Sequence, residues 1–599
     1  MIAMLTVWVV LAAVTLPVGL FLVALTGEAK PRGPIERDVT VALWIGLFAQ
    51  SVLLLLLAVA APLYPWGCLA MPVAAVLAGI ARRHDLAALI RKLIALPRVA
   101  PAAIIALAAA VAFVSTSRIS NYDSALYHIQ FMRWLARDGL VPGLGLLHIR
   151  LGIPSSWFAL AAAFDAGPLQ GRMAAAVNGY AVLLIGMQTS LCLTRILIRD
   201  ERAGDWLLAV GCGLLLFYAL WTDTAVSASP DLPVAAATVL IGWVMAANNE
   251  SYGHQSAATC MLLAGFGVGL KLSAAPLLVV AALYGLWHLR ASPRRLVMPT
   301  AAIAVILGVS AAASIILSGC PAFPETVACL DVPWTITPTE AARFRDGITY
   351  FARWYASPVT GTGPWDWVLP YFLHPGNRLN PPLLLLALAS LGTELAIPSL
   401  RRRALLGAGG WILALGLADL VFVMINAPDT RFAVGAIALI FAQAWASGIA
   451  ALRTRTAAAP LVPGRRDASK ALLVFALLGG AGIVGFRVLA VDRVVATRWA
   501  LHPYAAVLAV DLRSPMTERW LFPPTLPVRY GVTRTRDGHV LALQTASRGD
   551  VPYGKPPLGD QCWGTAEPCT PAATAAFRLR RPNLGLAGGF VRAPGAPKR

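Results

Sequence analysis

The chain has 599 residues, of which 58% are hydrophobic and 13% are charged. Soluble domains carry about 25% charged residues, so this composition excludes a soluble globular enzyme, and the high apolar content also excludes a disordered chain. A formal net charge of +20 would indicate nucleic-acid binding in a soluble protein, but here the basic residues flank apolar segments. The sequence therefore predicts an all-α polytopic membrane protein with no nucleic-acid partner.

A transmembrane helix needs about 20 mainly apolar residues, and about fourteen segments of the chain meet or approach this length. The first segment lacks a basic flank and a small-residue cleavage site, so we interpret it as a helix and not as a signal peptide. In chain order, the predicted spans are 4–26, 41–61, 63–80, 100–117, 172–194, 206–223, 231–248, 256–271, 272–288, 297–317, 381–398, 405–425, 431–452 and 470–490.

Lysine and arginine gather in alternate connections between these spans, which is the pattern typical of cytoplasmic loops. The basic connections are 27–40, 81–99, 195–205, 288–296, 399–404 and 453–470. Both termini are therefore expected on the extracytoplasmic side. Three larger pieces are expected on the same side, namely 118–171, 318–380 and 491–599.

The chain divides into three predicted parts. Residues 1–99 form an N-terminal block of three membrane helices that ends in a basic amphipathic segment, and residues 100–490 form the main transmembrane core. Residues 491–599 form a small extracytoplasmic cap that contains β-strands. The strands are expected because Asp537-Gly538 favours a tight hairpin turn.

Four of the eight cysteines form two close pairs, Cys320 with Cys329 and Cys562 with Cys569. Both pairs lie in pieces that the charge pattern places outside, where the compartment is oxidising and disulfides persist. We therefore expect two disulfides, and the alternative is four unrelated thiols. Neither pair has the spacing of a zinc site with histidine partners.

The first outer loop begins with the richest polar stretch of the chain. Asp123 precedes a predicted helix that runs to Trp134, and spacings of three and four residues put Tyr127 on the same face as this aspartate. One interpretation is structural, with Asp123 as the helix cap and the aromatic residues as an interfacial belt. The other makes Asp123 catalytic, with Tyr127 and His128 in contact with substrate.

The same loop continues with a second polar element around Arg150. A guanidinium near the membrane interface suits bidentate binding of a phosphate. Ser155, Ser156 and Trp157 follow, and they are candidates for substrate contact. The alternative for the two serines is ordinary chemistry at the start of a helix.

Further charged residues lie at the outer ends of other spans. Asp231 contacts substrate or caps a helix. Lys271 binds a phosphate or extends its amine to the membrane surface. Asp429 and Arg431 contact substrate or simply pair with one another.

The second outer loop adds Asp331 and Trp334, which suit sugar contact or belong to a folded loop. No phosphate-binding loop, zinc-protease motif or serine-hydrolase motif accompanies these residues. Few ionisable residues lie deep within the predicted spans. The chemistry is therefore expected where acids, cations and aromatics converge at the outer side.

These residues belong to an ordered series of motifs that resembles a poorly characterised bacterial family of polytopic membrane proteins. The long first outer loop, with an acid just after a span, more distantly resembles the GT-C superfamily of glycosyltransferases. The motifs are Tyr122-Asp-Ser-Ala-Leu-Tyr-His128, Arg150-Leu-Gly-Ile-Pro-Ser-Ser-Trp157, Ser229-Pro-Asp231, Lys271-Leu-Ser273, Ser318-Gly-Cys-Pro-Ala-Phe-Pro324, Asp331-Val-Pro-Trp334, Pro428-Asp-Thr-Arg-Phe432 and Asp560-Gln-Cys-Trp-Gly-Thr-Ala-Glu-Pro-Cys-Thr-Pro571.

The GT-C resemblance implies a helical bundle in the bacterial inner membrane. It also implies a polyprenyl-phosphate-linked sugar donor and an envelope glycan as acceptor. Asp123 would be the general base, while Arg150, Lys271 and Arg431 would stabilise the leaving phosphate. First loops of that superfamily often carry two acids, whereas Asp123 stands alone, so the sequence gives no support to a divalent metal and leaves it open.

Two other function classes fit the same topology. A transporter or flippase for a lipid-linked or anionic substrate is one, and it predicts ionisable residues deep within the spans. A non-enzymatic assembly protein of the envelope is the other, and it predicts no outward cavity at Asp123.

Overall fold

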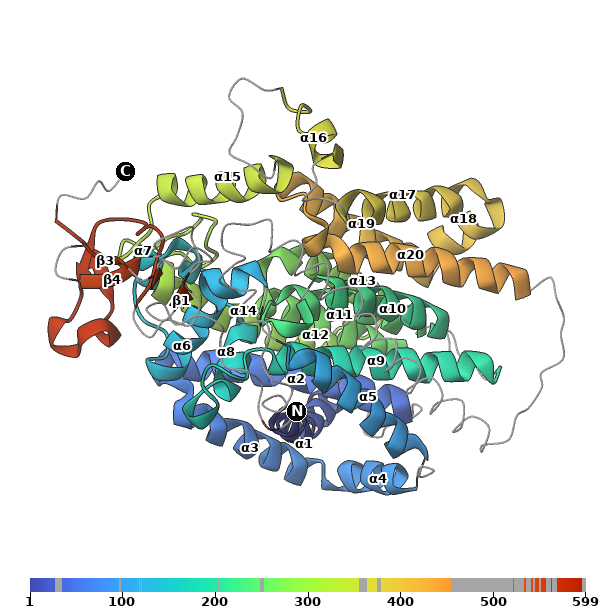
Figure 1. Ribbon diagram of the computed structural model, residues 1–599. Coiled ribbons are helices and arrows are strands. Elements are labelled where there is room, and N and C mark those ends of the chain that lie inside the picture. The colour runs from blue at the N-terminus through green and yellow to red at the C-terminus, as the bar shows by residue number, and fades with distance from the viewer. Residues whose placement is uncertain are drawn as a thin grey trace.

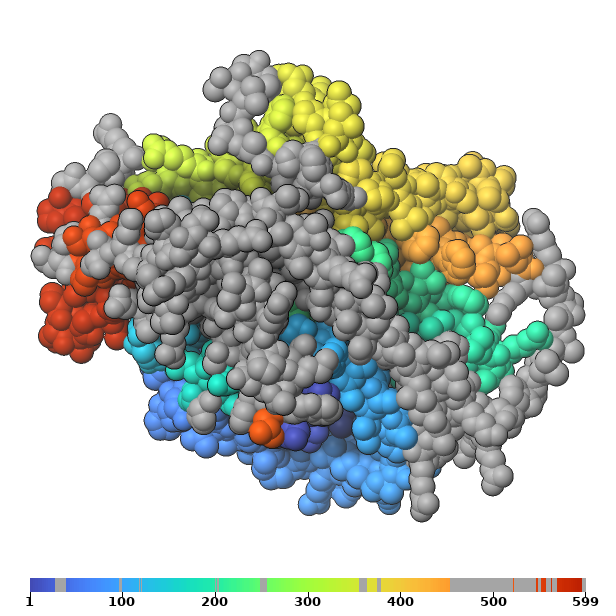
Figure 2. Space-filling view, viewed as in Figure 1, coloured from blue at the N-terminus to red at the C-terminus, as the bar shows by residue number. Residues whose placement is uncertain are grey.

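The computed structural model describes residues 1–26, 35–95, 99–117, 119, 121–199, 201, 204–222, 224–247, 253–354, 363–373, 379–453, 521, 533–534, 540–541, 544–548, 551–555, 562 and 568–594. Helices dominate these residues and pack as one bundle, with short strands at one end (Figure 1). In the space-filling view the N-terminal helices form the lower edge, and the C-terminal strands lie at the left (Figure 2).

Long apolar helices make up the bundle. Their order follows the predicted spans up to residue 452, while the predicted span 470–490 lies outside the described residues. They are α1 (Ile2–Leu25), α2 (Ile35–Ala60), α3 (Leu63–Ala81), α5 (Val99–Ser115), α9 (Ala176–Leu197), α10 (Asp205–Trp221), α11 (Asp231–Ala247), α12 (Gly253–Leu270), α13 (Ala275–Leu289), α14 (Arg294–Ser318), α17 (Asn380–Ala396), α19 (Ala408–Asn426) and α20 (Thr430–Arg453). A short basic helix, α18 (Pro398–Leu405), follows α17.

Among the described residues, eight helices are long and apolar enough to cross a membrane, or up to nine if the bent pair α17 and α18 is one span. Four other apolar helices, α5, α10, α11 and α12, are too short to meet that length. The chain is therefore a multi-pass membrane protein, and the predicted number of fourteen spans is not confirmed. The basic amphipathic segment predicted at 85–98 forms helix α4 (Arg83–Ile94).

Close backbone approach holds the first two helices together. A side chain at Gly19 of α1 would lie 1.7 Å from the carbonyl oxygen of Ala42 in α2, and one at Gly46 would lie 1.9 Å from the carbonyl oxygen of Thr15. Small residues of this kind drive helix association in lipid, where apolar side chains alone give little preference for protein over lipid.

The segment predicted as the first outer loop, 118–171, folds into short helices between α5 and α9. They are η1 (Ser124–His128), α6 (Ile129–Arg137), α7 (Leu144–Leu147), η2 (Ile149–Gly152) and α8 (Ser156–Phe164), and the second outer loop adds α15 (Pro338–Trp354) and α16 (Val368–Leu373). The predicted helix from Asp123 to Trp134 is thus present as η1 followed by α6.

The C-terminal region contains strands, as predicted. Strand β1 (Thr533–Arg534) pairs antiparallel with β2 (Val540–Leu541) at the predicted hairpin, whose Asp537-Gly538 turn lies outside the described residues. Two more antiparallel pairs follow, β3 (Gln544–Arg548) with β4 (Val551–Lys555) and β5 (Phe577–Leu579) with β6 (Phe590–Arg592).

The C-terminal segment docks on the two outer loops. The backbone N–H of Phe590 donates to Pro142 O at 2.8 Å, and that of Arg592 donates to Pro333 O at 3.0 Å. Gly143 has a left-handed φ of 73° and lies so close to Phe590 that a side chain at Gly143 would be 2.4 Å from the Phe590 carbonyl oxygen. The described outer loops and the C-terminal segment therefore share one end of the bundle.

Both predicted disulfides are confirmed. Cys320 bonds to Cys329, and Cys562 bonds to Cys569. The other four cysteines, which are all described, remain free thiols.

Candidate functional site

A π-helical turn, η1, opens the candidate site. Turns of this kind are rare and often mark functional positions. Asp123 precedes the turn, yet its side chain makes no capping hydrogen bond. Asn121 takes that role instead, since its Oδ1 accepts from the N–H of Ser124 at 3.2 Å and from the hydroxyl at 3.3 Å. The Asp123 carboxylate is therefore available for another partner.

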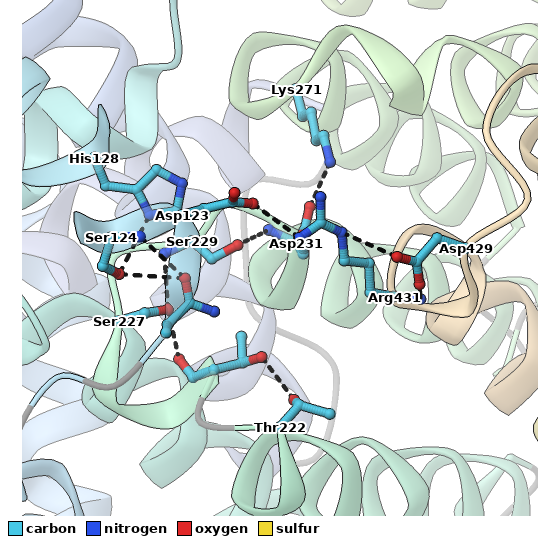
Figure 3. A network of polar contacts seen from close by, with 12 residues as sticks. Asp123, Ser124, His128, Thr222, Ser227, Ser229, Asp231, Lys271, Asp429 and Arg431 are labelled. Atoms are coloured by element: carbon cyan, nitrogen blue, oxygen red, sulfur yellow. Dashed lines mark hydrogen bonds and ion pairs between the residues drawn. The ribbon is translucent and has the colours of Figure 1, made fainter. Parts of the chain in front are cut away.

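That partner is Arg431, 308 residues further along the chain. Arg431 Nη1 donates to Asp123 Oδ2 at 2.8 Å, and the two side chains point toward one another (Figure 3). Arg431 also lies beside Asp429, with Nε 3.5 Å from Oδ2. The predicted pairing of Asp429 with Arg431 thus occurs, but the arginine joins both carboxylates.

A second ion pair lies next to the first. Lys271 Nζ is 2.5 Å from Asp231 Oδ1, while the Ser229 hydroxyl accepts the N–H of Asp231 at 3.3 Å. Phe432 connects the two pairs, because Lys271 Nζ lies 3.8 Å and Arg431 Cζ lies 4.4 Å from its ring centre. Lys271 is therefore part of the cluster.

Arg150 is the third cation, and aromatic rings hold it. Its Cζ lies 5.7 Å from the ring centre of Tyr127 and 5.6 Å from that of Phe344 in α15. No carboxylate pairs with this guanidinium among the residues that the structure describes. Arginine over ring faces keeps its charge and its donors free for a ligand.

Electrostatics joins these residues into one cluster. Burial disfavours a charge on Asp123, but Arg431, Arg150 and His128 outweigh it and hold the pKa of Asp123 well below its ordinary value. Burial lowers the pKa of His128 to about 4, against the opposing effect of the nearby Asp123 and Asp231 charges. Asp123 is therefore ionised and His128 neutral at physiological pH. Burial raises the pKa of Tyr127, so its hydroxyl stays protonated.

The serines and the tryptophan after Arg150 lie in the scaffold of the site. Ser155 Oγ donates to Leu270 O at 2.7 Å, immediately before Lys271, and Ser156 Oγ bonds Ser51 Oγ at 3.0 Å. Trp157 is fully buried. Their polar groups are thus engaged within the protein, and a direct substrate contact at these three positions has no support from the geometry.

Asn178 at the start of α9 is a residue that sequence reasoning missed. Its Oδ1 accepts from the Trp157 indole at 2.7 Å, and its Nδ2 donates to Thr224 O at 2.8 Å and to Ser229 O at 3.1 Å. The amide therefore fixes the backbone that leads into Asp231. A lone asparagine at the outer end of an apolar helix was the signal.

Asp419, inside α19, was also missed. It is 97% buried, and the charge of Lys271 acts on it. Most predicted spans do lack central ionisable residues, but this aspartate stands in the middle of an apolar run.

Asp331 and Trp334 lie where the second outer loop meets the C-terminal segment. Asp331 is exposed, while Trp334 Nε1 donates to Ile315 O at 3.0 Å and its ring lies 5.6 Å from Arg580 Cζ. Within the described part of the chain, no hydrogen bond, ion pair or ring contact joins either residue to Asp123. The structure brings the other predicted charges together and leaves these two apart.

The described residues hold no group of three or more histidine, cysteine, aspartate or glutamate side chains that fits a metal ion. Asp123 and Asp231 are each paired with a cation instead. The site can bind an anion at its cations and accept a hydrogen bond or a proton at its carboxylates.

Comparison with known proteins places the chain in a family. Residues 1–438 match the model of a family described as a domain of unknown function, DUF8201. The chain belongs to the DUF8201 family. No curated protein matches it.

Among solved structures, arabinosyltransferase EmbB from Mycobacterium smegmatis is similar at 14% sequence identity and a TM-score of 0.35, over 71% of this chain and 42% of that chain. The DUF8201 protein thus spans less than half the length of EmbB. The DUF8201 match includes every residue from Asp123 to Phe432 and ends before the C-terminal strands.

His148 allows a test of the buried outer loop of this DUF8201 protein. Burial and the Arg150 charge lower its pKa to about 3, against about 6.5 in an unfolded chain. Between these values the unfolded state binds more protons, so this histidine's contribution to stability is present above pH ~6.5 and is lost as pH falls, by on the order of 1.4 kcal/mol per pH unit.

We expect His148→Asn to weaken this dependence of stability on pH. In the wild type His148 Nδ1 accepts from the Arg150 N–H at 3.2 Å. The side-chain oxygen of the asparagine can accept the same hydrogen bond, and the amide does not titrate. The melting temperature of the purified protein, followed from about pH 7 to about pH 4.5, measures the effect. An equal decline in the variant and the wild type would assign the dependence to other groups.

Proposed function

We propose that this protein is a membrane glycosyltransferase. It transfers a sugar from a polyprenyl-phosphate-linked donor to an envelope acceptor, at the extracytoplasmic face of the bacterial inner membrane, with both chain termini on that face. The observation that carries the proposal is the cluster at one end of an apolar bundle, where ionised Asp123 lies beside Arg431 and shares its surroundings with Lys271 and Arg150.

In the proposed reaction the acceptor hydroxyl attacks the anomeric carbon of the donor sugar. The new bond joins that carbon to the acceptor oxygen, the bond from the carbon to the phosphate oxygen breaks, and the hydroxyl proton passes to an oxygen of Asp123. The departing lipid phosphate gains negative charge, and Arg150, Lys271 and Arg431 stabilise it. Tyr127 and His128 border the reacting groups, and Asp231 and Asp429 hold the cations.

Through the Asp123–Arg431 pair, binding of the donor also changes the basicity of the Asp123 carboxylate. While Arg431 bonds Asp123, the carboxylate holds a proton weakly. A donor phosphate that engages Arg431 weakens this hold and makes Asp123 a stronger base. The carboxylate therefore becomes effective when the donor is present, which limits wasteful proton transfer in the empty site.

The three parts of the chain take separate roles in the proposal. Residues 1–99 form the N-terminal membrane block, 100–490 form the catalytic core, and 491–599 form a cap over the outer end. Asp331 and Trp334, at the junction with the cap, suit contact with the acceptor glycan at a distance from Asp123.

A transporter for an anionic or lipid-linked substrate is the second candidate, and two buried acids favour it. Asp419 and Glu394 lie inside helices and are at least 97% buried, and ionisable groups within spans often serve transport. Transport predicts that substrate crosses the membrane without a change in covalent structure.

Mass spectrometry separates the two functions. The purified protein is placed in lipid nanodiscs with a polyprenyl-phosphate sugar and an envelope extract as acceptor, and release of polyprenyl phosphate is measured. Lipid-linked sugars and envelope glycans are compared in cells with and without the gene. Loss of one sugar from the envelope with accumulation of its lipid-linked donor supports the transferase, whereas unchanged glycans and no lipid release contradict it.

Arg150 gives a direct test of phosphate binding. We expect Arg150→Ala to weaken binding of polyprenyl phosphate about tenfold or more, because a charge-assisted bidentate contact is lost. Native mass spectrometry or thermal-shift titration with polyprenyl phosphate measures this. Arg137→Ala is the matched control, since Arg137 lies in the same loop over the ring of Trp134 at 5.1 Å and is 56% exposed. Equal affinity of both variants would remove Arg150 from the phosphate site.

A further inference from the structure

The π-helical turn η1 leaves one backbone acceptor to be supplied from elsewhere. In an α-helix the N–H of Ile129 would bond the carbonyl of Ala125, but here it bonds Ser124 O. Ala125 is fully buried, and a buried carbonyl needs a partner. The N–H of Cys562 fills that need, at 2.9 Å from Ala125 O.

Cys562 is held in place by its disulfide. Its partner Cys569 adjoins Thr570 and Pro568, whose backbone groups bond both sides of Gly554 in β4, at 3.0 and 2.8 Å. A few residues further on, Thr574 bonds the first outer loop through its N–H to Leu146 O at 3.1 Å and through its hydroxyl to Gly145 O at 2.8 Å. The disulfide thus connects a docked segment to the turn beside Asp123.

We propose that the Cys562–Cys569 disulfide is a positioning element for Asp123, an inference that rests on the proposed function. By bonding Ala125 O, Cys562 favours the π-helical register over the α-helical one. A π-helical turn contains one residue more than the α-helical path, and one residue corresponds to a rotation of about 100°. Loss of the turn therefore rotates Asp123 relative to α6 and away from Arg431, while Arg431 stays on α20 and Lys271 stays at its position between α12 and the next helical turn.

The experiment compares two double variants of the full-length protein in nanodiscs. Cys562→Ala/Cys569→Ala removes the connection, and Cys320→Ala/Cys329→Ala removes the other disulfide as a matched control. Hydrogen exchange of peptides covering 121–137 reports the turn. We expect exchange in this region to rise about tenfold or more in the first variant and to stay at the wild-type level in the control.

Turnover of a polyprenyl-phosphate sugar supplies the second readout. We expect kcat to fall about tenfold or more in the first variant while KM for the donor changes less than threefold, because the phosphate-binding cations lie on other elements. Unchanged exchange at 121–137, or an equal rise in the control, overturns the inference. An equal loss in kcat and affinity also overturns it, since that pattern indicates general damage.

Reduction of the folded protein covers the case in which the first variant does not fold. In the Cys320→Ala/Cys329→Ala background, Cys562–Cys569 is the one disulfide left, so dithiothreitol acts on it selectively and reoxidation should restore protection at 121–137. If the wild type shows no turnover, the proposed function fails, but the exchange measurements still decide whether Cys562 holds the turn.

Discussion

Asp123→Asn should lower the rate of sugar transfer by about 10²- to 10⁴-fold, which is the usual contribution of a positioned general base. The amide has the shape of the carboxylate but cannot take the acceptor's proton. Arg431 keeps Asp429 as a partner, so the protein should reach the membrane at its normal level. Release of polyprenyl phosphate from the lipid-linked donor measures the loss.

Asp138→Asn is the control for this result. Asp138 belongs to the same outer loop and pairs at 2.7 Å with its neighbour Arg137, away from the cluster. We expect this variant to retain activity within about twofold, because Asp138 pairs with Arg137, whose side chain is 56% exposed, and forms no hydrogen bond or ion pair with the cluster in the described part of the chain. Full transfer by Asp123→Asn would remove Asp123 from the mechanism.

Arg431→Gln is the second change with a large expected effect. It removes a cation from the phosphate site and leaves the Asp123 carboxylate, whose side chain is only 14% exposed, without its partner. We expect transfer to fall about 10²-fold or more and the melting temperature to fall as well, because an uncompensated buried charge destabilises a fold.

The double variant Asp123→Asn/Arg431→Gln tests whether the lost stability comes from the unpaired Asp123 charge. Removal of the orphaned charge should return part of the lost melting temperature, so the double variant should be more stable than Arg431→Gln alone. Transfer should not recover with the stability, so it should stay at or below the level of Arg431→Gln in the double variant. A double variant less stable than either single variant would contradict a direct Asp123–Arg431 interaction.

Apolar run length predicted most of the bundle. The spans expected at 4–26 and 431–452, for example, are α1 and α20 within about two residues, because lipid exposure requires continuous apolar sequence. Apolar run length did not predict the number of spans. Helices such as α11 are shorter than a straight membrane span. The bend at Ile397 divides the chain from 380 to 405 into two helices.

Parts of the candidate site were also predictable, because acids and cations at the same ends of neighbouring spans lie on one side of the bundle. Their pairing was not, since Asp123 and Arg431 are 308 residues apart and tertiary packing brings them together. Trp157 was a candidate for substrate contact, but its side chain is fully buried and its indole N–H donates to Asn178 Oδ1. The π-helical turn depends on Cys562, a residue far along the chain, so local sequence gave no sign of it.

The bend between α17 and α18 bears on the depth of the site relative to the lipid headgroups. α17 begins beside the cluster, where Thr430 bonds Asn380, so the 105° turn into α18 occurs at the opposite end of the bundle. There α18 presents the exposed residues Arg401, Arg402 and Arg403, which are suited to the phosphates of the far leaflet. These arginines would bind lipid phosphates of the far leaflet and so fix the depth of the protein in the bilayer. The reacting groups at the other end would then stay at the level of the headgroups of the near leaflet.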